Sequence, residues 1–136
     1  MGHVCLLSAQ DAISWAIYHD KKLLFTSTIE NEEQNIINVS PGDLKNNRNF
    51  TIAYSDEKPW HSAAEWKRTI GIFTTADREL LRKDSSIVKI PDKRLKELLL
   101  ANKVIRIYTW SLPKDPKEAA RVRVRRVHLC TIKLKQ

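Results

Sequence analysis

The chain has 136 residues, of which 42% are hydrophobic and 29% are charged, and its formal net charge is +8. This composition is that of an ordinary globular protein and excludes a disordered or fibrous chain. No apolar run approaches the roughly 18 residues that a membrane span needs, and the start of the chain lacks a signal-peptide pattern. We therefore expect a single cytoplasmic domain over residues 1–136 that does not contact a membrane.

Charge is distributed unevenly along the chain. Residues 1–66 carry five lysines and arginines against nine aspartates and glutamates, whereas residues 67–136 carry nineteen against seven. A basic surface attracts polyanions such as nucleic acid. The acidic half is expected to face a protein partner or a second copy of the chain.

Cysteine, histidine and glycine usage predicts neither a metal site nor a cofactor. The two cysteines, Cys5 and Cys130, lie far apart in apolar segments, and the four histidines are scattered. No C-x-x-C, H-E-x-x-H or glycine-rich phosphate loop is present. The cysteines are expected to be reduced and buried, with a disulfide between them as the alternative.

The first half of the chain predicts one helix, three strands and part of a second helix. A Ser-x-x-Asp cap at Ser8, followed by Ile13, Ala16 and Ile17 at helical spacing, predicts a helix over 9–19. β-Branched and apolar runs predict strands over residues 23–29, 36–40 and 50–54, with a turn-rich loop over 41–49. Ser62 and Glu65 form a second cap, which predicts a short helix near 63–68.

The second half predicts four strands and two further helices. The expected elements are a strand over 69–74, a helix over 75–83, an extended stretch over 87–90, a helix over 92–102, and strands over 104–112 and 120–134. The helix after Pro91 has the clearest pattern, because Leu95, Leu98 and Leu99 form one apolar stripe. The last two strands are predicted to form a hairpin. Without strict alternation of strands and helices, the order predicts an α+β domain with a mixed or antiparallel sheet and about four short helices.

An arginine-rich segment, RVRVRRVH, begins at Arg121. In a strand alternate residues share a face, so Arg121, Arg123 and Arg125 are predicted to line one side of the sheet. Guanidinium groups bind phosphate oxygens through paired hydrogen bonds, which makes this row a candidate contact for nucleic acid. The same phase adds Lys133, whereas Arg126 breaks the alternation through a predicted bulge.

The strand that faces this segment carries Arg106, Tyr108 and Trp110 on one side. Cations interleaved with exposed aromatic rings are typical of sites for single-stranded nucleic acid. In the alternative interpretation the arginines only keep one sheet face in water and protect its edge, and the two rings belong to the core.

The helix over 92–102 followed by a hairpin is similar to the second half of a winged helix. There a recognition helix enters the major groove of DNA and the hairpin forms a wing. The residues expected to contact DNA are then Lys93, Arg94, Lys96 and Lys103, with Lys114 and Lys117 at the tip of the wing.

An enzymatic alternative rests on His61, which follows two acidic residues in a loop. A histidine beside carboxylates can act as a general acid or base near neutral pH. With phosphate held by Lys67 or Arg68, this would suit a small metal-independent ribonuclease or toxin. The opposing interpretation is a surface histidine without a catalytic role.

The leading hypothesis is a non-enzymatic nucleic-acid-binding protein, DNA or RNA, that contacts phosphates through its basic C-terminal helix and hairpin. The expected contact residues are Arg121, Arg123, Arg125, Arg126, Lys133, Arg106, Trp110, Lys93 and Arg94. A ribonuclease that uses His61 and a protein-interaction or assembly subunit remain the two alternatives.

Overall fold

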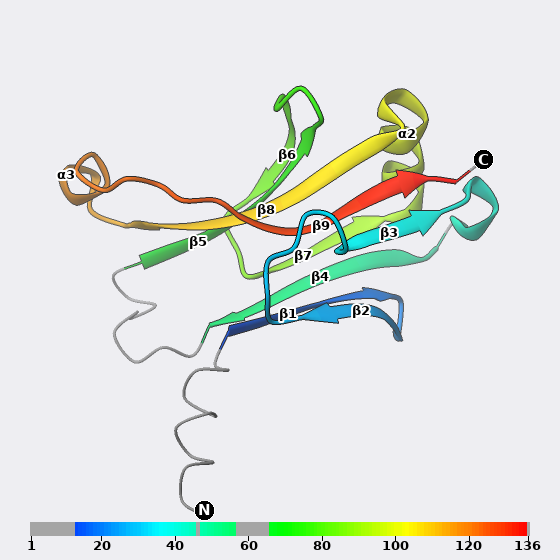
Figure 1. Cartoon of the computed structure of the whole chain (residues 1–136), viewed down its shortest axis with the longest axis horizontal. Coiled ribbons are helices and arrows are strands. Elements are labelled where there is room, and N and C mark those ends of the chain that lie inside the picture. Colours follow the sequence, from blue (N-terminus) through cyan, green and yellow to red (C-terminus); the bar gives the residue numbers. More distant parts are fainter. Residues whose placement is uncertain (1–12, 46, 57–65, 136) are drawn as a thin grey trace, which may run out of the picture.

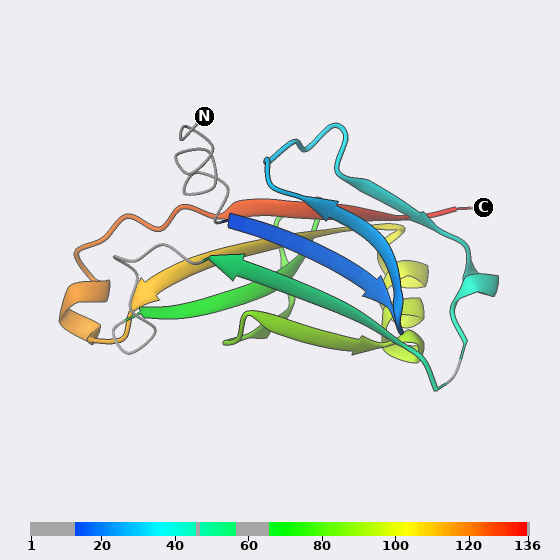
Figure 2. The same ribbon diagram turned by 90° about the horizontal axis from the view of Figure 1, so that it is seen from below.

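The computed structural model describes residues 13–45, 47–56 and 66–135. Its strands form two sheets that enclose a common core (Figures 1 and 2). The first is a four-stranded sheet in the order β2-β1-β4-β7, and the second is a five-stranded sheet in the order β3-β9-β8-β5-β6. The arrangement in the described residues is therefore a β-sandwich, with helices only at its two ends.

The four-stranded sheet is antiparallel throughout. Its strands are β2 (Lys22–Ser27), β1 (Ile13–His19), β4 (Asn49–Asp56) and β7 (Ile87–Pro91). Side chains alternate between the faces of a strand, so Trp15 and Ile17 of β1 point into the core while Ala16 lies on the outer face. On β4 the inward phase is that of Phe50, Ile52 and Tyr54.

The five-stranded sheet is antiparallel except that β3 runs parallel to β9. Its strands are β3 (Ile36–Val39), β9 (Val127–Leu134), β8 (Val104–Pro113), β5 (Trp66–Thr74) and β6 (Glu79–Lys83). The helical segments are a 3-10 turn η1 (Pro41–Asp43), α2 (Asp92–Asn102) and α3 (Pro116–Ala119). Helices α2 and α3 lie at opposite ends of the long axis of the molecule (Figures 1 and 2).

The core fills the space between the sheets and ends beneath α2. The indole Nε1 of Trp15 crosses this space and donates a hydrogen bond of 2.9 Å to the carbonyl oxygen of Leu129. Leu95 and Leu99 of α2 are fully buried in the same apolar cluster. The leucine stripe of α2 thus closes one end of the sandwich.

A buried carboxylate fixes the start of α2 to the rest of the fold. Asp92 is 1% exposed, and its Oδ2 lies 2.7 Å from Nε2 of His19, at the end of β1. The backbone N–H of Lys45 donates to the same oxygen at 2.9 Å, and that of Asp92 donates to the carbonyl of Arg48. Three segments far apart in sequence therefore meet at this one side chain.

The outer face of the five-stranded sheet carries a second, smaller apolar cluster of Phe73, Tyr108 and Trp110. Gly71 lies beneath it, and a Cβ atom there would lie 2.8 Å from atoms of both Phe73 and Trp110. The missing side chain of Gly71 therefore makes room for the indole ring of Trp110.

The predicted α+β class with about four helices is wrong, and the predicted helix over 9–19 is one cause. The part of this range that is described, from Ile13, forms β1. Ile13 and Ile17 also satisfy a period of two once Trp15 is counted, and isoleucine, tryptophan and tyrosine favour strands. The expected cap at Ser8 lies outside the described residues.

The predicted helices near 63–68 and over 75–83 are also wrong. Trp66–Arg68 belongs to β5, while residues 63–65 lie outside the described ranges. Thr74 does cap a segment, but its Oγ1 accepts the backbone N–H groups of Ala76 and Arg78 in a tight turn between β5 and β6. Asp77 adopts a φ of 65° in that turn. The hydroxyl that can cap a helix caps a turn here.

The winged-helix-like half and the long final strand are wrong as well. Strand β8 is paired on both sides, with β5 and β9, so the β8–β9 hairpin lies within the sheet and does not project as a wing. Strand β9 begins only at Val127, whereas the predicted strand began near residue 120. The strands predicted over 23–29, 36–40, 50–54, 69–74 and 104–112 and the helix over 92–102 are confirmed within a few residues.

The burial of His128 is expected to make the stability of the fold depend on pH. It is fully buried in β9, Nε2 lies 2.7 Å from Thr131 Oγ1, and its ring meets Tyr108 edge-on. Burial lowers the pKa of His128 below its ordinary value, against the opposing effect of Glu32 and Glu30; Arg106 adds to the lowering.

Because the unfolded chain binds the His128 proton more tightly, this residue should lower stability as the pH falls below about 6.5, by up to about 1.4 kcal/mol per pH unit. Urea unfolding between pH 5 and pH 8 measures this dependence. His128→Gln should flatten it, and an unchanged pH profile in that variant would contradict the assignment.

Candidate nucleic-acid interface

Residues 121–126 of the arginine-rich segment lie between α3 and β9 and belong to neither sheet, whereas Val127 and His128 begin β9. Figure 1 shows the segment running from α3 back to the start of β9. Residues 121–125 are exposed, including the apolar Val122 and Val124 at 37% and 44%. The predicted row of arginines on a sheet face is therefore wrong, and the guanidinium groups project from a surface segment.

Two of the four arginines bind acidic side chains of the chain itself. Arg125 Nη2 donates to Glu30 Oε1 at 2.9 Å, and the backbone N–H of His128 donates to the other oxygen of Glu30 at 2.8 Å. Arg126 pairs with Asp77 at 2.9 Å. The guanidinium of Arg126 also lies over the outer aromatic cluster, 4.3 Å from the ring centroid of Tyr108 and 4.8 Å from that of Phe73.

Four other cations near α3 have no acidic partner in the part of the chain that the structure describes. Among the described residues, no ion pair involves Arg121, Arg123, Lys114 or Lys117, and all four are exposed. Lys114 and Lys117 flank the start of α3, and the two arginines follow that helix directly. We call the surface formed by Lys114, Lys117, Arg121 and Arg123 the basic end.

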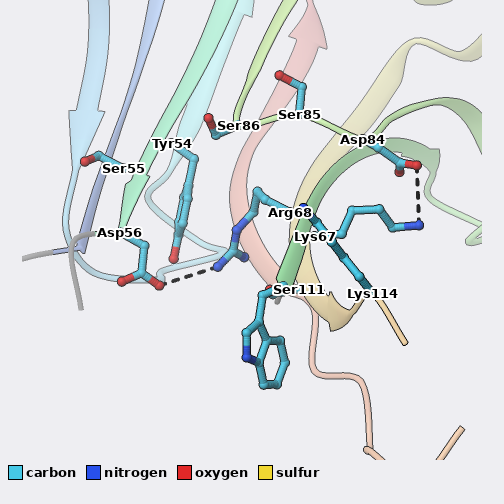
Figure 3. A pocket seen from close by; sticks show the side chains of 11 residues that line it. Tyr54, Ser55, Asp56, Lys67, Arg68, Asp84, Ser85, Ser86, Ser111 and Lys114 are labelled. Carbon is cyan, nitrogen blue, oxygen red and sulfur yellow. Dashed lines mark hydrogen bonds and ion pairs between the residues drawn. The ribbon is translucent and has the colours of Figure 1, made fainter. Parts of the chain in front are cut away.

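A cleft opens beside the basic end, where the two sheets part (Figure 3). Its volume is about 470 Å³. The lining residues are Tyr54, Ser55, Asp56, Trp66, Lys67, Arg68, Asp84, Ser85, Ser86, Ser111 and Lys114. Lys114 thus belongs both to the cleft and to the basic end. Whereas α2 closes one end of the sandwich, the described residues leave this opposite end open.

Arg68 extends from β5 into the space between the sheets, in phase with the core residues Ile70 and Ile72. Its guanidinium lies 4.3 Å from the ring centroid of Tyr54 on the facing sheet. One nitrogen lies 3.5 Å from Asp56 Oδ2 and another lies 3.4 Å from Thr109 Oγ1. The side chain of Arg68 is 19% exposed, so a positive charge lies half-buried at the back of the cleft.

The second charged pair lies on the wall of the cleft, where Lys67 Nζ is 3.5 Å from Asp84 Oδ2. The Thr69 hydroxyl donates to Asp84 Oδ1 at 2.9 Å and, with help from Lys67, holds the pKa of that carboxyl below its usual value. Burial raises the pKa of the Tyr54 phenol, which therefore stays protonated at neutral pH. The cleft thus combines two paired carboxylates with three cations and several neutral hydroxyl groups.

The remaining residues of the predicted interface lie elsewhere. Lys93 and Arg94 are exposed on α2, at the far end of the sandwich, and Arg94 lies 3.6 Å from Glu97. Lys133 is exposed on β9, and Arg106 is half-buried on β8. Trp110 shares the outer face with Arg106 as expected, but it is only 5% exposed and Arg82 lies over its ring at 5.2 Å. The structure therefore does not bring the nine predicted residues together.

From the sequence, Arg68 and Lys67 were expected only as phosphate holders for a ribonuclease, and His61 itself lies outside the described residues. A signal for the cleft is present in the sequence. Trp66, Arg68, Ile70 and Ile72 share one phase of β5, which places a single arginine on a face that otherwise points into the core. In β5, this single cation among inward-facing residues lies where the core gives way to the solvent-accessible cleft.

Within the described ranges, no group of three or more histidine, cysteine, aspartate or glutamate side chains is arranged to hold a metal ion. In that same part of the chain, no helix has the length and apolar character needed to cross a membrane. Comparisons of the sequence with protein-family models, with curated proteins and with solved structures returned no match.

Proposed function

We propose that this protein binds nucleic acid through the basic end and the adjoining cleft. The observation that carries the proposal is the run of exposed cations that form no ion pair within the described residues, from Lys114 to Arg123, beside a cleft that contains Arg68 and Lys67. Lysine and arginine supply most of the affinity for nucleic acid by neutralising phosphates and releasing counterions. The location at α3 replaces the surface expected from the sequence, which combined α2 with a hairpin face.

The experiment is a titration of short labelled oligonucleotides at two salt concentrations, read by fluorescence anisotropy. Affinity should fall as salt rises. Arg121→Gln with Arg123→Gln should reduce the slope of log K against log salt by about 0.7 for each single-strand phosphate that the variant no longer neutralises. Lys93→Gln with Arg94→Gln removes the same charge at the far end and should leave the slope unchanged. Binding that is insensitive to salt, or an equal decrease of affinity in both double variants, would refute the proposal.

A further inference from the structure

We infer that the cleft accommodates one unpaired nucleotide, with its phosphate against Arg68, so that the protein prefers single-stranded to double-stranded nucleic acid. This inference rests on the proposed function and names the substrate class of the same site. It follows from the geometry of Arg68, from the groups that surround it and from the size of the opening.

Within the described ranges, the neighbours of Arg68 leave part of its hydrogen-bonding capacity unused. A guanidinium carries five N–H donors, and hydrogen bonds from nitrogen to oxygen are most often near 2.9–3.0 Å. The two contacts of Arg68 are longer, at 3.4 Å to Thr109 and 3.5 Å to Asp56. A cation–π contact with the Tyr54 ring, 4.3 Å from Cζ to the ring centroid, holds the group in place without using its N–H donors. A phosphate that enters the cleft can accept hydrogen bonds from the remaining donors.

The groups around Arg68 fit a phosphate that is joined to a ring. Donor side chains outnumber carboxylates in the lining, which contains Lys67, Lys114 and four serines besides Arg68, while the two carboxylates each lie beside a cation. Phosphate offers several acceptor oxygens and is the preferred ligand of such arginine and lysine groups. Trp66 contributes an aromatic side chain to the same lining. Bases stack on such rings in sites for single strands.

The size and depth of the cleft select an unpaired strand. A volume of about 470 Å³ lies within the usual range of small-ligand pockets, roughly 300–1,000 Å³, and far below the size of a duplex. The Arg68 side chain is only 19% exposed, between the two sheets. In a duplex each base is stacked and paired, so a phosphate and its base cannot enter such a cleft together. An unpaired nucleotide can, while the neighbouring phosphates contact the basic end.

The test compares a labelled single strand with a duplex of the same sequence on the full chain, on Arg68→Gln and on Arg82→Gln. Arg82 is the matched control, because its guanidinium also lies over an aromatic ring, that of Trp110, but on the outer face. We expect single-strand affinity to fall about tenfold in Arg68→Gln, with the duplex affected less than about twofold. Arg82→Gln should bind both probes as the unmodified protein does.

Because Arg68→Gln also removes the Tyr54 contact, its thermal unfolding is measured alongside. Lys114→Gln, at the exposed rim, provides a second variant that should lower single-strand affinity more than duplex affinity even if Arg68→Gln does not fold. Competition with adenosine 5′-monophosphate and with inorganic phosphate distinguishes the contribution of the nucleoside to binding from that of the phosphate. We expect the mononucleotide to compete at lower concentration.

The outcomes distinguish this inference from the proposed function. Equal affinity for single strand and duplex, or an equal decrease of affinity in Arg68→Gln and Arg82→Gln, would overturn the inference. If Arg121→Gln with Arg123→Gln then still weakened binding of both probes, the proposed function would stand alone. Adenosine 5′-monophosphate binding that requires Arg68, without any oligonucleotide binding, would support the nucleotide site and refute the wider function.

Discussion

Replacement of Trp15 by alanine should lower the free energy of unfolding by about 3–5 kcal/mol. Trp15 is 2% exposed, packs between the two sheets and stacks with Tyr54 at a centroid separation of 6.2 Å. It also supplies the hydrogen bond from its indole to the carbonyl of Leu129, on the facing sheet. The substitution therefore removes a large buried ring and one of the polar links between the sheets. Urea denaturation measures the decrease as a shift of the midpoint.

Trp15→Phe helps to separate the two contributions, because it keeps a buried aromatic ring but deletes the donor together with part of the indole. Its expected cost is about 1–3 kcal/mol, since the carbonyl of Leu129 is left without its partner inside the core. If Trp15→Phe were as stable as the unmodified protein, the hydrogen bond between the sheets would contribute nothing to stability.

Replacement of His19 by leucine should cost about 1–3 kcal/mol, because it leaves Oδ2 of the buried Asp92 without its imidazole partner. The imidazole lies 2.7 Å from that carboxylate, and Asp92 is 1% exposed at the first turn of α2. Among the described residues, the remaining donor to the Asp92 side chain is the backbone N–H of Lys45. Thermal or urea unfolding of the single variant gives the cost.

The double variant His19→Leu with Asp92→Leu is the control for this pair. Replacing both partners by apolar groups also removes the buried carboxyl group that would lack its partner, so the double variant should be more stable than His19→Leu alone. A double variant that is destabilised by the full sum of the two single effects would show that His19 and Asp92 act independently.

The helix α2 could be predicted from the sequence because several local signals agree. Pro91 precedes the helix at its N-cap and Asp92 begins the first turn, while Leu95, Leu98 and Leu99 form one buried stripe. Strands such as β4 and β8 could also be predicted, since their β-branched and aromatic residues alternate with polar ones. Where propensity, periodicity and capping coincide, tertiary contacts only confirm the local preference.

The first strand could not be predicted, because its pattern is ambiguous over so short a length. Ile13, Ala16 and Ile17 fit a helix, and Ile13, Trp15 and Ile17 fit a strand. Long-range pairing decides between helix and strand, since β1 lies between β2 and β4 and forms hydrogen bonds with both. No window of sequence contains those partners.

The arginine-rich segment was wrongly predicted to be a strand for a different reason. Alternation of arginine and valine is the pattern of a half-buried strand, yet both Val122 and Val124 are exposed. Strand β8 pairs with β9 only as far as Thr109, opposite Val127, so the preceding residues have no place in the ladder. The cleft was harder still to predict, because Tyr54, Arg68 and Lys114 come from three strands or their ends and meet only through the packing of two sheets.

The contact between Glu30 and the start of β9 has a consequence for how the arginine-rich segment meets a ligand. One carboxylate fixes both the Arg125 side chain and the backbone of His128, and α3 fixes the other end of the segment. Ordering a free loop on association costs conformational entropy, which weakens binding. Here much of that ordering takes place when the chain folds. Arg121 and Arg123 thus lie on a segment that is preorganised for binding. Glu30→Gln should make this segment less ordered without removing any positive charge.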